Sequence, residues 1–583
     1  MVALAAAAFA VGAVIGAQSG ASPADSLAGQ FVAAWTKGDY VAMYTALDAP
    51  SRRAVSAARF ASAYREALIT ATATGMHVTG APRGESGGRV VVPVVVSTRL
   101  FGELALDFTM RVTEAGGEGA GISWSPSLAF PGVQPGETLS RHTVLPQRAT
   151  LLARDGSVLA EGPSGSAVAT QAGETTRSSP LGEDARALLG EVGPIPSSRR
   201  GELEAEGVPA DALVGLSGLE RALDEELRGT PGGELLAGAR VLASVQPHQA
   251  SAVRTSISPA LQRAAVTALG GQLGGVVALE PSSGRILAVG GIGLDGLQPP
   301  GSTFKIVTLT GVLQAGVASP HTVFPYATYA TLDGVKLHNA GGEECGGTLE
   351  HAFAVSCNSV FTPLGVRLGS ARLVHAAESF GFNEQPGLAG VPESTLPTAA
   401  SIQGELELGS TAIGQGQVLA TPLQMAIVAA TIADAGRRPA PTFLLGARPS
   451  FVARASSAAV ARTVRRLMIG VVRSGTGTAA AIAGVTVAGK TGTAELKSPC
   501  TPAAGEPGSS EPASAEAPKE AGRERCSGTE TEASNTDAWF VAYAPALHPR
   551  IAVCVLLVKD GAGGTTAAPV ARQVLEAGLQ AGL

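Results

Sequence analysis

The hydrophobic pattern of the first quarter of the chain changes from a helical to a strand period. Apolar residues within 26–71 recur at helical spacing, and the Gly-Asp pair at 38–39 separates two predicted helices. The following stretch contains three apolar runs separated by glycine-rich turns, which predict antiparallel strands at 90–96, 101–112 and 122–130. Helices followed by a sheet predict an α+β domain over residues 23–135.

The pattern becomes less regular in the next hundred residues. Residues 136–250 alternate glycine-rich, charged and proline-containing segments and contain few long apolar runs. Such a composition predicts an elongated pedestal rather than a compact core.

A regular pattern returns in residues 251–583, where we expect an antiparallel sheet flanked by helices. A helical stretch at 258–270 precedes the runs GGVVALEP and GRILAVGG, which read as a strand hairpin, and helical segments continue over 302–480. The C-terminal part contains three strand candidates, GVTVAGKTGTAEL, DAWFVAYAP and RIAVCVLLVK, and a last helix at about 567–581. The chain is therefore predicted to be a multidomain α+β protein.

One segment between the first two of these C-terminal strands differs in composition. Residues 498–535 are rich in Pro, Gly, Ser and Glu, and such a segment buries too little apolar surface to offset the entropy of ordering it. We expect a flexible insertion in a strand hairpin.

Composition narrows the class of protein further. The 583 residues are enough for several domains, and the 75 Gly and 37 Pro make up about a fifth of the chain, less than in low-complexity chains. The 42 Lys and Arg against 48 Asp and Glu give a net charge of −6, so no basic surface field predicts a nucleic-acid partner. Only seven residues are Lys, which makes each of them worth inspecting.

The N-terminal segment 1–22 is predicted to be an export signal or membrane anchor. Residues 2–17 form an uninterrupted apolar run. A helix of that length rises about 24 Å, somewhat less than the roughly 30 Å of the hydrocarbon core of a bilayer. No Lys or Arg precedes this segment, although a signal sequence or anchor normally has one there. A start codon assigned too far downstream would account for the missing basic residue. A buried alanine-rich helix is the alternative.

The five cysteines do not predict a metal site. They contain no C-x-x-C pair and His is scattered, so a zinc site has no support in the sequence. If the chain is exported, Cys345–Cys357 and Cys500–Cys526 are candidate disulfides, because each closes a short loop. Cys554 lies in an apolar run and is predicted to be a free, buried side chain.

The first chemical motif is Ser302-x-x-Lys305 in PPGSTFKIVTLTG. Residues three apart share a helix face, so the lysine amine can lie against the serine hydroxyl. Serine is a weak nucleophile until a base takes its proton, and a lysine does so when burial lowers its pKa. We therefore interpret Ser302 as a nucleophile and Lys305 as its base, although S-x-x-K alone is a common pattern.

Two further motifs follow in order. Ser356-Cys357-Asn358 offers a hydroxyl for proton relay and an amide for binding a substrate amide. Lys490-Thr491-Gly492-Thr493 ends a predicted strand and offers cationic and hydroxyl groups for a carboxylate. Each motif alone is weak evidence, but S-x-x-K, S-x-N and K-T-G in this order are typical of penicillin-binding proteins and class A β-lactamases.

On these motifs the chain resembles the class B penicillin-binding proteins. The stretches TAIGQGQVLATPLQMAIVAATIADAG (411–436) and DAWFVAYAP (537–545) are also similar to that family. RATLLARDGSVLA (148–160) resembles the family's pedestal element, except at Ala149 and Ala153, and GLSGLERALDEELRGTPG (215–232) resembles another. Residues 24–135 resemble the NTF2-like extension of one subgroup.

The resemblance implies a D,D-transpeptidase that cross-links the stem peptides of peptidoglycan and is a target of β-lactams. Ser302 would attack the penultimate D-Ala carbonyl, with Lys305 as the general base. Ser356 and Lys490 would relay a proton to the leaving amine, and Asn358 would hold substrate amides. Thr491 and Thr493 would bind the terminal carboxylate beside Gly492, and the N–H groups of Ser302 and Thr493 would form the oxyanion hole. Neither a metal nor an organic cofactor is implied.

The resemblance also implies a cellular setting and leaves alternatives open. The family members are anchored in the bacterial plasma membrane with their catalytic domains outside the cytoplasm, and a membrane glycan polymerase of the SEDS class is the expected partner. A D,D-carboxypeptidase or β-lactamase on the same fold would pass the acyl group to water instead. The third hypothesis is a non-catalytic penicillin-binding sensor or scaffold, and the three intact motifs disfavour it.

Overall fold

The structure is a computed structural model that describes residues 22–115, 119–161, 177–495 and 536–583. By their contacts these residues form two compact units, which are described separately. Unit 1 comprises residues up to Gln147 together with Pro194–Leu213 and Arg228–Gln249, and unit 2 comprises the remainder. The segment 136–250, predicted to be one pedestal, therefore contributes to both units.

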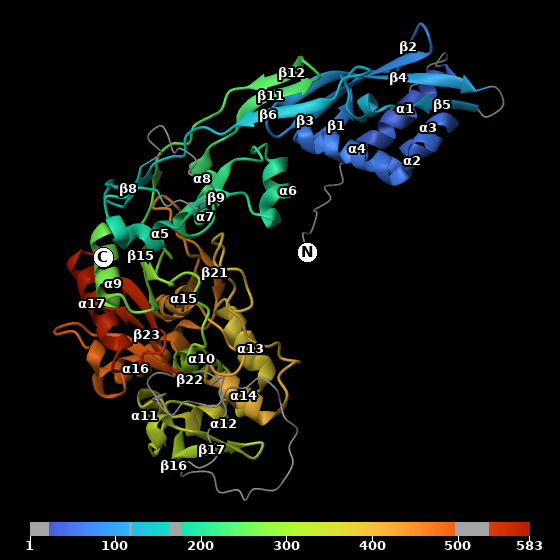
Figure 1. The fold of residues 1–583 in the computed structure, drawn as a ribbon. Coiled ribbons are helices and arrows are strands. Elements are labelled where there is room, and N and C mark those ends of the chain that lie inside the picture. The colour runs from blue at the N-terminus through green and yellow to red at the C-terminus, as the bar shows by residue number, and fades with distance from the viewer. Residues whose placement is uncertain (1–21, 116–118, 162–176, 496–535) are drawn as a thin grey trace, which may run out of the picture. The chain divides into compact units, whose positions relative to one another are not determined.

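Unit 1 begins with four helices that lie along one side of a sheet (Figure 1). They are α1 (Pro23–Thr36), α2 (Tyr40–Thr45), α3 (Ala49–Ala54) and α4 (Ala57–Thr70). Two helices were expected, but Asp39, Asp48 and Ser56 each accept a hydrogen bond from a backbone N–H three residues on and so start a new helix.

The sheet of unit 1 has the strand order β1-β3-β4-β5, with β2 paired to β3. Its strands are β1 (Ala73–Val78), β2 (Arg83–Glu85), β3 (Arg89–Thr98), β4 (Gly102–Ala115) and β5 (Gly119–Ser123). The predicted strand at 122–130 stops at Ser123, because Pro126 opens a 3₁₀ turn, Pro126–Ala129. The same unit contains α6 (Ser197–Ala205) and a second sheet of order β12-β11-β6, with β6 Leu139–Val144, β11 Gly232–Ala237 and β12 Arg240–Val245.

A buried ion cluster joins segments of unit 2 that lie far apart in sequence. The Nε atoms of Arg148 and Arg177 each lie 2.6 Å from a carboxylate oxygen of Glu220, which is fully buried. Arg148 also reaches Asp224 at 2.8 Å. The two pedestal elements predicted from residues 148–160 and 215–232 therefore meet here, and Ala149 and Ala153 are small buried side chains beside them.

The core of unit 2 is an antiparallel sheet of order β15-β14-β24-β23-β22. The strands are β14 (Gly274–Leu279), β15 (Ile286–Gly291), β22 (Ala488–Glu495), β23 (Thr536–Ala544) and β24 (Ile551–Leu557). One face packs on α9 (Pro259–Leu269) and α17 (Ala567–Gln580), and the other on α15 (Pro422–Ala433). Because the central strands are covered on both faces, their sequences are continuous apolar runs rather than alternating ones.

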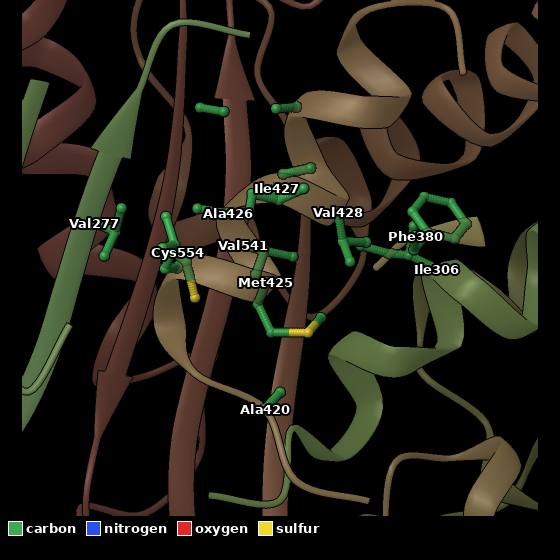
Figure 2. Packing of buried hydrophobic residues seen from close by; sticks show 14 of the residues in the cluster. Val277, Ile306, Phe380, Ala420, Met425, Ala426, Ile427, Val428, Val541 and Cys554 are labelled. Carbon is green, nitrogen blue, oxygen red and sulfur yellow. The ribbon is translucent and has the colours of Figure 1, made fainter. Parts of the chain in front are cut away.

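Helix α15 lies between the sheet and the helix that follows Ser302. Figure 2 shows Met425, Ala426 and Ile427 of α15 beside strand residues Val541 and Cys554, with Ile306 and Phe380 on the far side. All twelve residues of α15 are buried. The sheet therefore fixes α10 (Lys305–Gln314) through a fully buried helix that is apolar except at Gln424 and Thr431.

The remainder of unit 2 is mostly helical, as predicted, but it also contains short strand pairs that were not predicted. The helices are α5 (Arg186–Leu189), α7 (Gly218–Ala222), α11 (Leu349–Ala354), α12 (Asn358–Leu368), α13 (Ser370–Ser379), α14 (Gly404–Ala412) and α16 (Ala458–Ser474). The short strands are β7 (Leu151–Leu152), β8 (Val158–Ala160), β13 (Val253–Arg254), β16 (Val323–Ala327), β17 (Tyr329–Leu332), β18 (Val335–His338), β19 (Cys345–Thr348), β20 (Arg437–Pro439) and β21 (Phe451–Arg454). These strands are two to five residues long, too short for a clear alternation of polar and apolar positions.

Two predicted features lie outside the described residues: the apolar segment at 2–17 and the whole insertion at 498–535. Across the four described ranges, no helix has the length and apolar character needed to cross a membrane.

The ion cluster gives the first prediction. Replacing Glu220 by alanine leaves the buried guanidinium groups of Arg148 and Arg177 without this carboxylate, and we expect the free energy of unfolding to fall by about 3–5 kcal/mol. Glu183→Ala is the control, because Glu183 and its partner Arg186 are both exposed, and such a pair contributes less than about 1 kcal/mol. Urea unfolding of both variants measures the difference, and equal losses would contradict a stabilising role for the cluster.

Candidate active site

Ser302 lies in a tight turn that positions it before α10. The turn is a 3₁₀ segment, Gly301–Phe304, and Lys305 is the first residue of the α-helix. Gly301 has φ +51°, and a Cβ there would lie 2.7 Å from the carbonyl oxygen of Thr493. Glycine therefore allows this turn to approach strand β22, which carries the K-T-G motif.

Lys305 is fully buried and contacts the S-x-N turn. Its Nζ lies 2.7 Å from the carbonyl oxygen of Ser356, 2.6 Å from Asn358 Oδ1 and 3.4 Å from Ser356 Oγ. Burial lowers the pKa of Lys305 well below its usual value, and the charge of Lys490 lowers it further. A neutral amine can donate its two N–H groups to the two carbonyl-type oxygens and keep its lone pair for a hydroxyl proton.

The hydrogen bonds described for the Lys305 amine do not include Ser302, although the motif spacing suggested such a contact. Among the described residues, the hydrogen bonds of its Nζ go to Ser356 and Asn358 of the next motif. The two residues still lie one 3₁₀ turn apart, where side chains at i and i+3 eclipse one another. Hydrogen bonds between catalytic groups are often long before substrate binds, so the assignment of Lys305 as the base is retained.

Ser356 lies between the two lysines. Its hydroxyl accepts a hydrogen bond from Lys490 Nζ at 2.9 Å, and its backbone has φ +62°, in the left-handed region. Asn358 follows in the same turn and donates to the carbonyl oxygen of His338 at 2.9 Å. The structure contains the Cys345–Cys357 disulfide, which links this turn to strand β19, whereas Cys500 and Cys526 lie outside the described residues.

Lys490 lies within the edge strand β22 and is also fully buried. Its ammonium donates to the carbonyl oxygen of Thr491 at 2.9 Å as well as to Ser356. Burial lowers the pKa of Lys490 to about 7, so its charge changes near neutral pH. Aromatic rings support both amines, with Lys305 Nζ 5.4 Å from the centre of Phe361 and Lys490 Nζ 5.6 Å from that of Phe353.

The remaining residues of the K-T-G motif lie beside the nucleophile turn. A Cβ at Gly492 would lie 2.8 Å from the carbonyl oxygen of Pro300, so this glycine lets the turn and strand meet. Thr493 Oγ1 accepts a long hydrogen bond, 3.4 Å, from the N–H of Gly563. The three predicted motifs are thus brought together, although they span 192 residues of sequence, from Ser302 to Thr493.

The sequence did not predict three contributors to this site. The hydroxyls of Thr476 and Thr491 lie 2.6 Å apart, His338 holds Asn358, and the Gly414 carbonyl accepts from the N–H of Gly301 at 2.9 Å. The repeated Gly-Thr in GTGT (475–478) is the only local signal for Thr476. No motif spacing relates it to Thr491, because the contact depends on the turn that joins α16 to β22.

The arrangement is suited to serine acyl transfer. Ser302 lies in the turn that leads into α10, which begins with Lys305, one of two buried lysines whose pKa values are lowered. The hydroxyl of a second serine, Ser356, lies within hydrogen-bond distance of both lysines. In the described part of the chain, no group of three or more His, Cys, Asp or Glu side chains could hold a metal ion.

Comparisons with protein families match most of the chain. Residues 274–506 match the penicillin-binding protein transpeptidase domain, and residues 166–241 match the penicillin-binding protein dimerisation domain. Residues 23–137 match the NTF2-like N-terminal transpeptidase domain.

Individual relatives agree with these matches. The peptidoglycan D,D-transpeptidase PbpA of Mycolicibacterium smegmatis is 33% identical over 439 residues, which cover 63% of this chain and 80% of the relative. The peptidoglycan D,D-transpeptidase MrdA of Acinetobacter baumannii is 28% identical over 69% of this chain and 66% of its own length. The crystal structure of PBPA from Mycobacterium tuberculosis superposes with a TM-score of 0.55 at 28% identity, covering 74% of this chain and 99% of that one. A ceftriaxone acyl-enzyme of the same M. tuberculosis protein superposes equally well, at 27% identity.

Fold, motifs and site together define a penicillin-recognising serine transpeptidase. The chain belongs to the class B penicillin-binding proteins with an NTF2-like N-terminal domain. The predictions of the family, of a multidomain α+β fold and of a serine-type D,D-transpeptidase are confirmed by these matches.

Proposed function

We propose that the protein cross-links peptidoglycan stem peptides through an acyl-enzyme formed at Ser302, and that β-lactams acylate the same hydroxyl. The observation that carries the proposal is the linked set of Lys305, Ser356 and Lys490, in which one hydroxyl lies within hydrogen-bond distance of two buried amines. This set supplies both a base for the nucleophile and an acid for the leaving group.

The acylation step begins with proton transfer from Ser302 to the neutral amine of Lys305. Ser302 Oγ attacks the carbonyl carbon of the penultimate D-Ala, and the bond from that carbon to the terminal D-Ala nitrogen breaks. The leaving amine takes a proton from Ser356 Oγ, which is replenished from the Lys490 ammonium 2.9 Å away. Lys305 ends this step charged and Lys490 ends it neutral.

The second step runs the same transfers in reverse. The amine of a neighbouring stem peptide attacks the acyl carbon and gives its proton through Ser356 to Lys490, while Ser302 recovers its proton from Lys305. The new amide is the cross-link, and both lysines return to their starting states. No metal or organic cofactor enters either step.

Substrate binding is assigned to the strand and turns around the nucleophile. The N–H groups of Ser302 and Thr493 are the proposed oxyanion hole, since Gly301 brings their two backbones close together. Asn358 would bind an amide of the stem peptide, and Thr491 and Thr493 would bind its terminal carboxylate.

The location and partner belong to the same proposal. The apolar segment at 2–17 would anchor the protein in the bacterial plasma membrane, with both units outside the cytoplasm. A membrane glycan polymerase of the SEDS class is the proposed partner, as the membership of the class B penicillin-binding proteins suggests.

The proposal predicts a covalent adduct with a fluorescent penicillin that depends on Ser302. We expect Ser302→Ala to lose labelling completely. Lys305→Ala should lose at least about a thousandfold in acylation rate, because its serine lacks a base within reach. Gel fluorescence over time measures both, and thermal unfolding checks that each variant is folded.

The lifetime of the wild-type adduct separates the reaction classes. A long-lived adduct is expected for a transpeptidase, whereas rapid loss of the label would favour the hydrolase. Labelling that survives Ser302→Ala would refute Ser302 as the nucleophile, and wild-type acylation by Lys305→Ala would refute Lys305 as the base. A wild-type protein that is never labelled would refute both enzyme hypotheses, transpeptidase and hydrolase, and leave a non-catalytic role.

The two lysines predict a bell-shaped dependence of acylation rate on pH. Lys305 must be neutral to accept a proton, so the rate rises with pH as its amine deprotonates. Lys490 must be charged to donate, so the rate declines above a pKa of about 7. Lys490→Arg keeps its charge at high pH but cannot give up its proton, so we expect it to lose most of the acylation rate together with the alkaline decline, which stopped-flow acylation at pH 5–10 measures. A wild-type rate that stays constant from pH 7 to 10 would contradict this role of Lys490.

A further inference from the structure

Thr476 is the residue of the site that no motif covers. It lies in the turn after α16, and its N–H donates to the carbonyl oxygen of Ala354 at 3.1 Å, two residues before Ser356. Its hydroxyl lies 2.6 Å from that of Thr491, the second residue of the K-T-G motif. Thr476 therefore connects the turn of the second motif with the strand of the third.

The direction of these hydrogen bonds follows from the donors available. In its charged form Lys490 is only a hydrogen-bond donor, and its Nζ makes a long contact of 3.4 Å with Thr491 Oγ1. When Thr491 accepts this contact, its own proton is directed to the hydroxyl 2.6 Å away, that of Thr476. The Thr476 proton is then free, because the Ala354 carbonyl oxygen lies at a weak 3.5 Å.

Exposure distinguishes the two threonines. Thr491 is 5% exposed, whereas Thr476 belongs to the exposed class. The chain of hydroxyls therefore starts at a buried cation and ends at a donor that a ligand can reach. A donor polarised in this way suits an anionic acceptor, since hydrogen bonds to charged groups are about twice as strong as neutral ones.

We propose that Thr476 is a further substrate-binding residue, whose hydroxyl donates to the terminal carboxylate of the acyl-donor peptide together with Thr491 and Thr493. The inference rests on the proposed function and extends it. Thr476 adds a donor from the α16 turn to those of strand β22, so the carboxylate is held from two segments of the chain. Selectivity for a free carboxylate over an uncharged end then depends partly on Thr476.

A matched pair of substrates tests this role. The first is a D-Ala thioester that ends in a free carboxylate, and the second is the same thioester ending in a carboxamide. We expect Thr476→Val, which keeps the shape and removes the hydroxyl, to lower kcat/KM about ten- to hundredfold for the carboxylate substrate and less than about twofold for the carboxamide. Thr476→Ser keeps the hydroxyl and should restore most of the activity.

Controls separate this inference from the proposed function. Thr478→Val alters an exposed threonine two residues further on, and it should leave both substrates unaffected. Equal losses of Thr476→Val on both substrates, or no loss on either, would overturn the role of Thr476 in carboxylate binding. Ser302→Ala is measured in parallel: if it still turns over the carboxylate thioester, the proposed function itself fails, whatever Thr476→Val does.

Discussion

The site depends on burying two lysine amines around one serine hydroxyl. Lys305 and Lys490 are both fully buried, and neither forms an ion pair with a carboxylate in the described part of the chain. Their partners are carbonyl, amide and hydroxyl oxygens, together with the faces of Phe361 and Phe353. A carboxylate would stabilise the ammonium form and raise the pKa, so without one burial lowers the pKa of both amines.

Holding two such amines in place requires a rigid surrounding. The five-stranded sheet is covered on both faces, and α15, buried along its whole length, transmits that rigidity to the helix that carries Lys305 (Figure 2). Glycines at 301 and 492 then allow the nucleophile turn and the edge strand to approach more closely than any side chain would permit. The desolvation that lowers both pKa values is therefore a consequence of packing around the site, and not of the three motifs alone.

Local sequence patterns predicted the fold where segments were long and regular. The hairpin of β14 and β15, the three C-terminal strands and the last helix follow directly from apolar runs and helical periodicity. The pattern of apolar and polar positions was insufficient where a single residue decides the point at which a helix or strand begins or ends. Asp48 and Ser56 divide one predicted helix into separate ones, and Pro126 ends a strand early. The short strand pairs around β16–β19 have too few residues for a period to be detected.

The sequence by itself determined the chemistry, because Ser302, Lys305, Ser356, Asn358 and Lys490 occur as an ordered set in a chain that has only seven lysines. Only the tertiary structure decided how they act on one another. It directs Lys305 toward Ser356 and Asn358 rather than Ser302, and it adds Thr476 and His338 to the site. The reason is physical: residue types fix which protons can be exchanged, whereas distance and burial fix between which atoms and at what pKa. Both arise from contacts between residues 51 to 134 positions apart in the sequence.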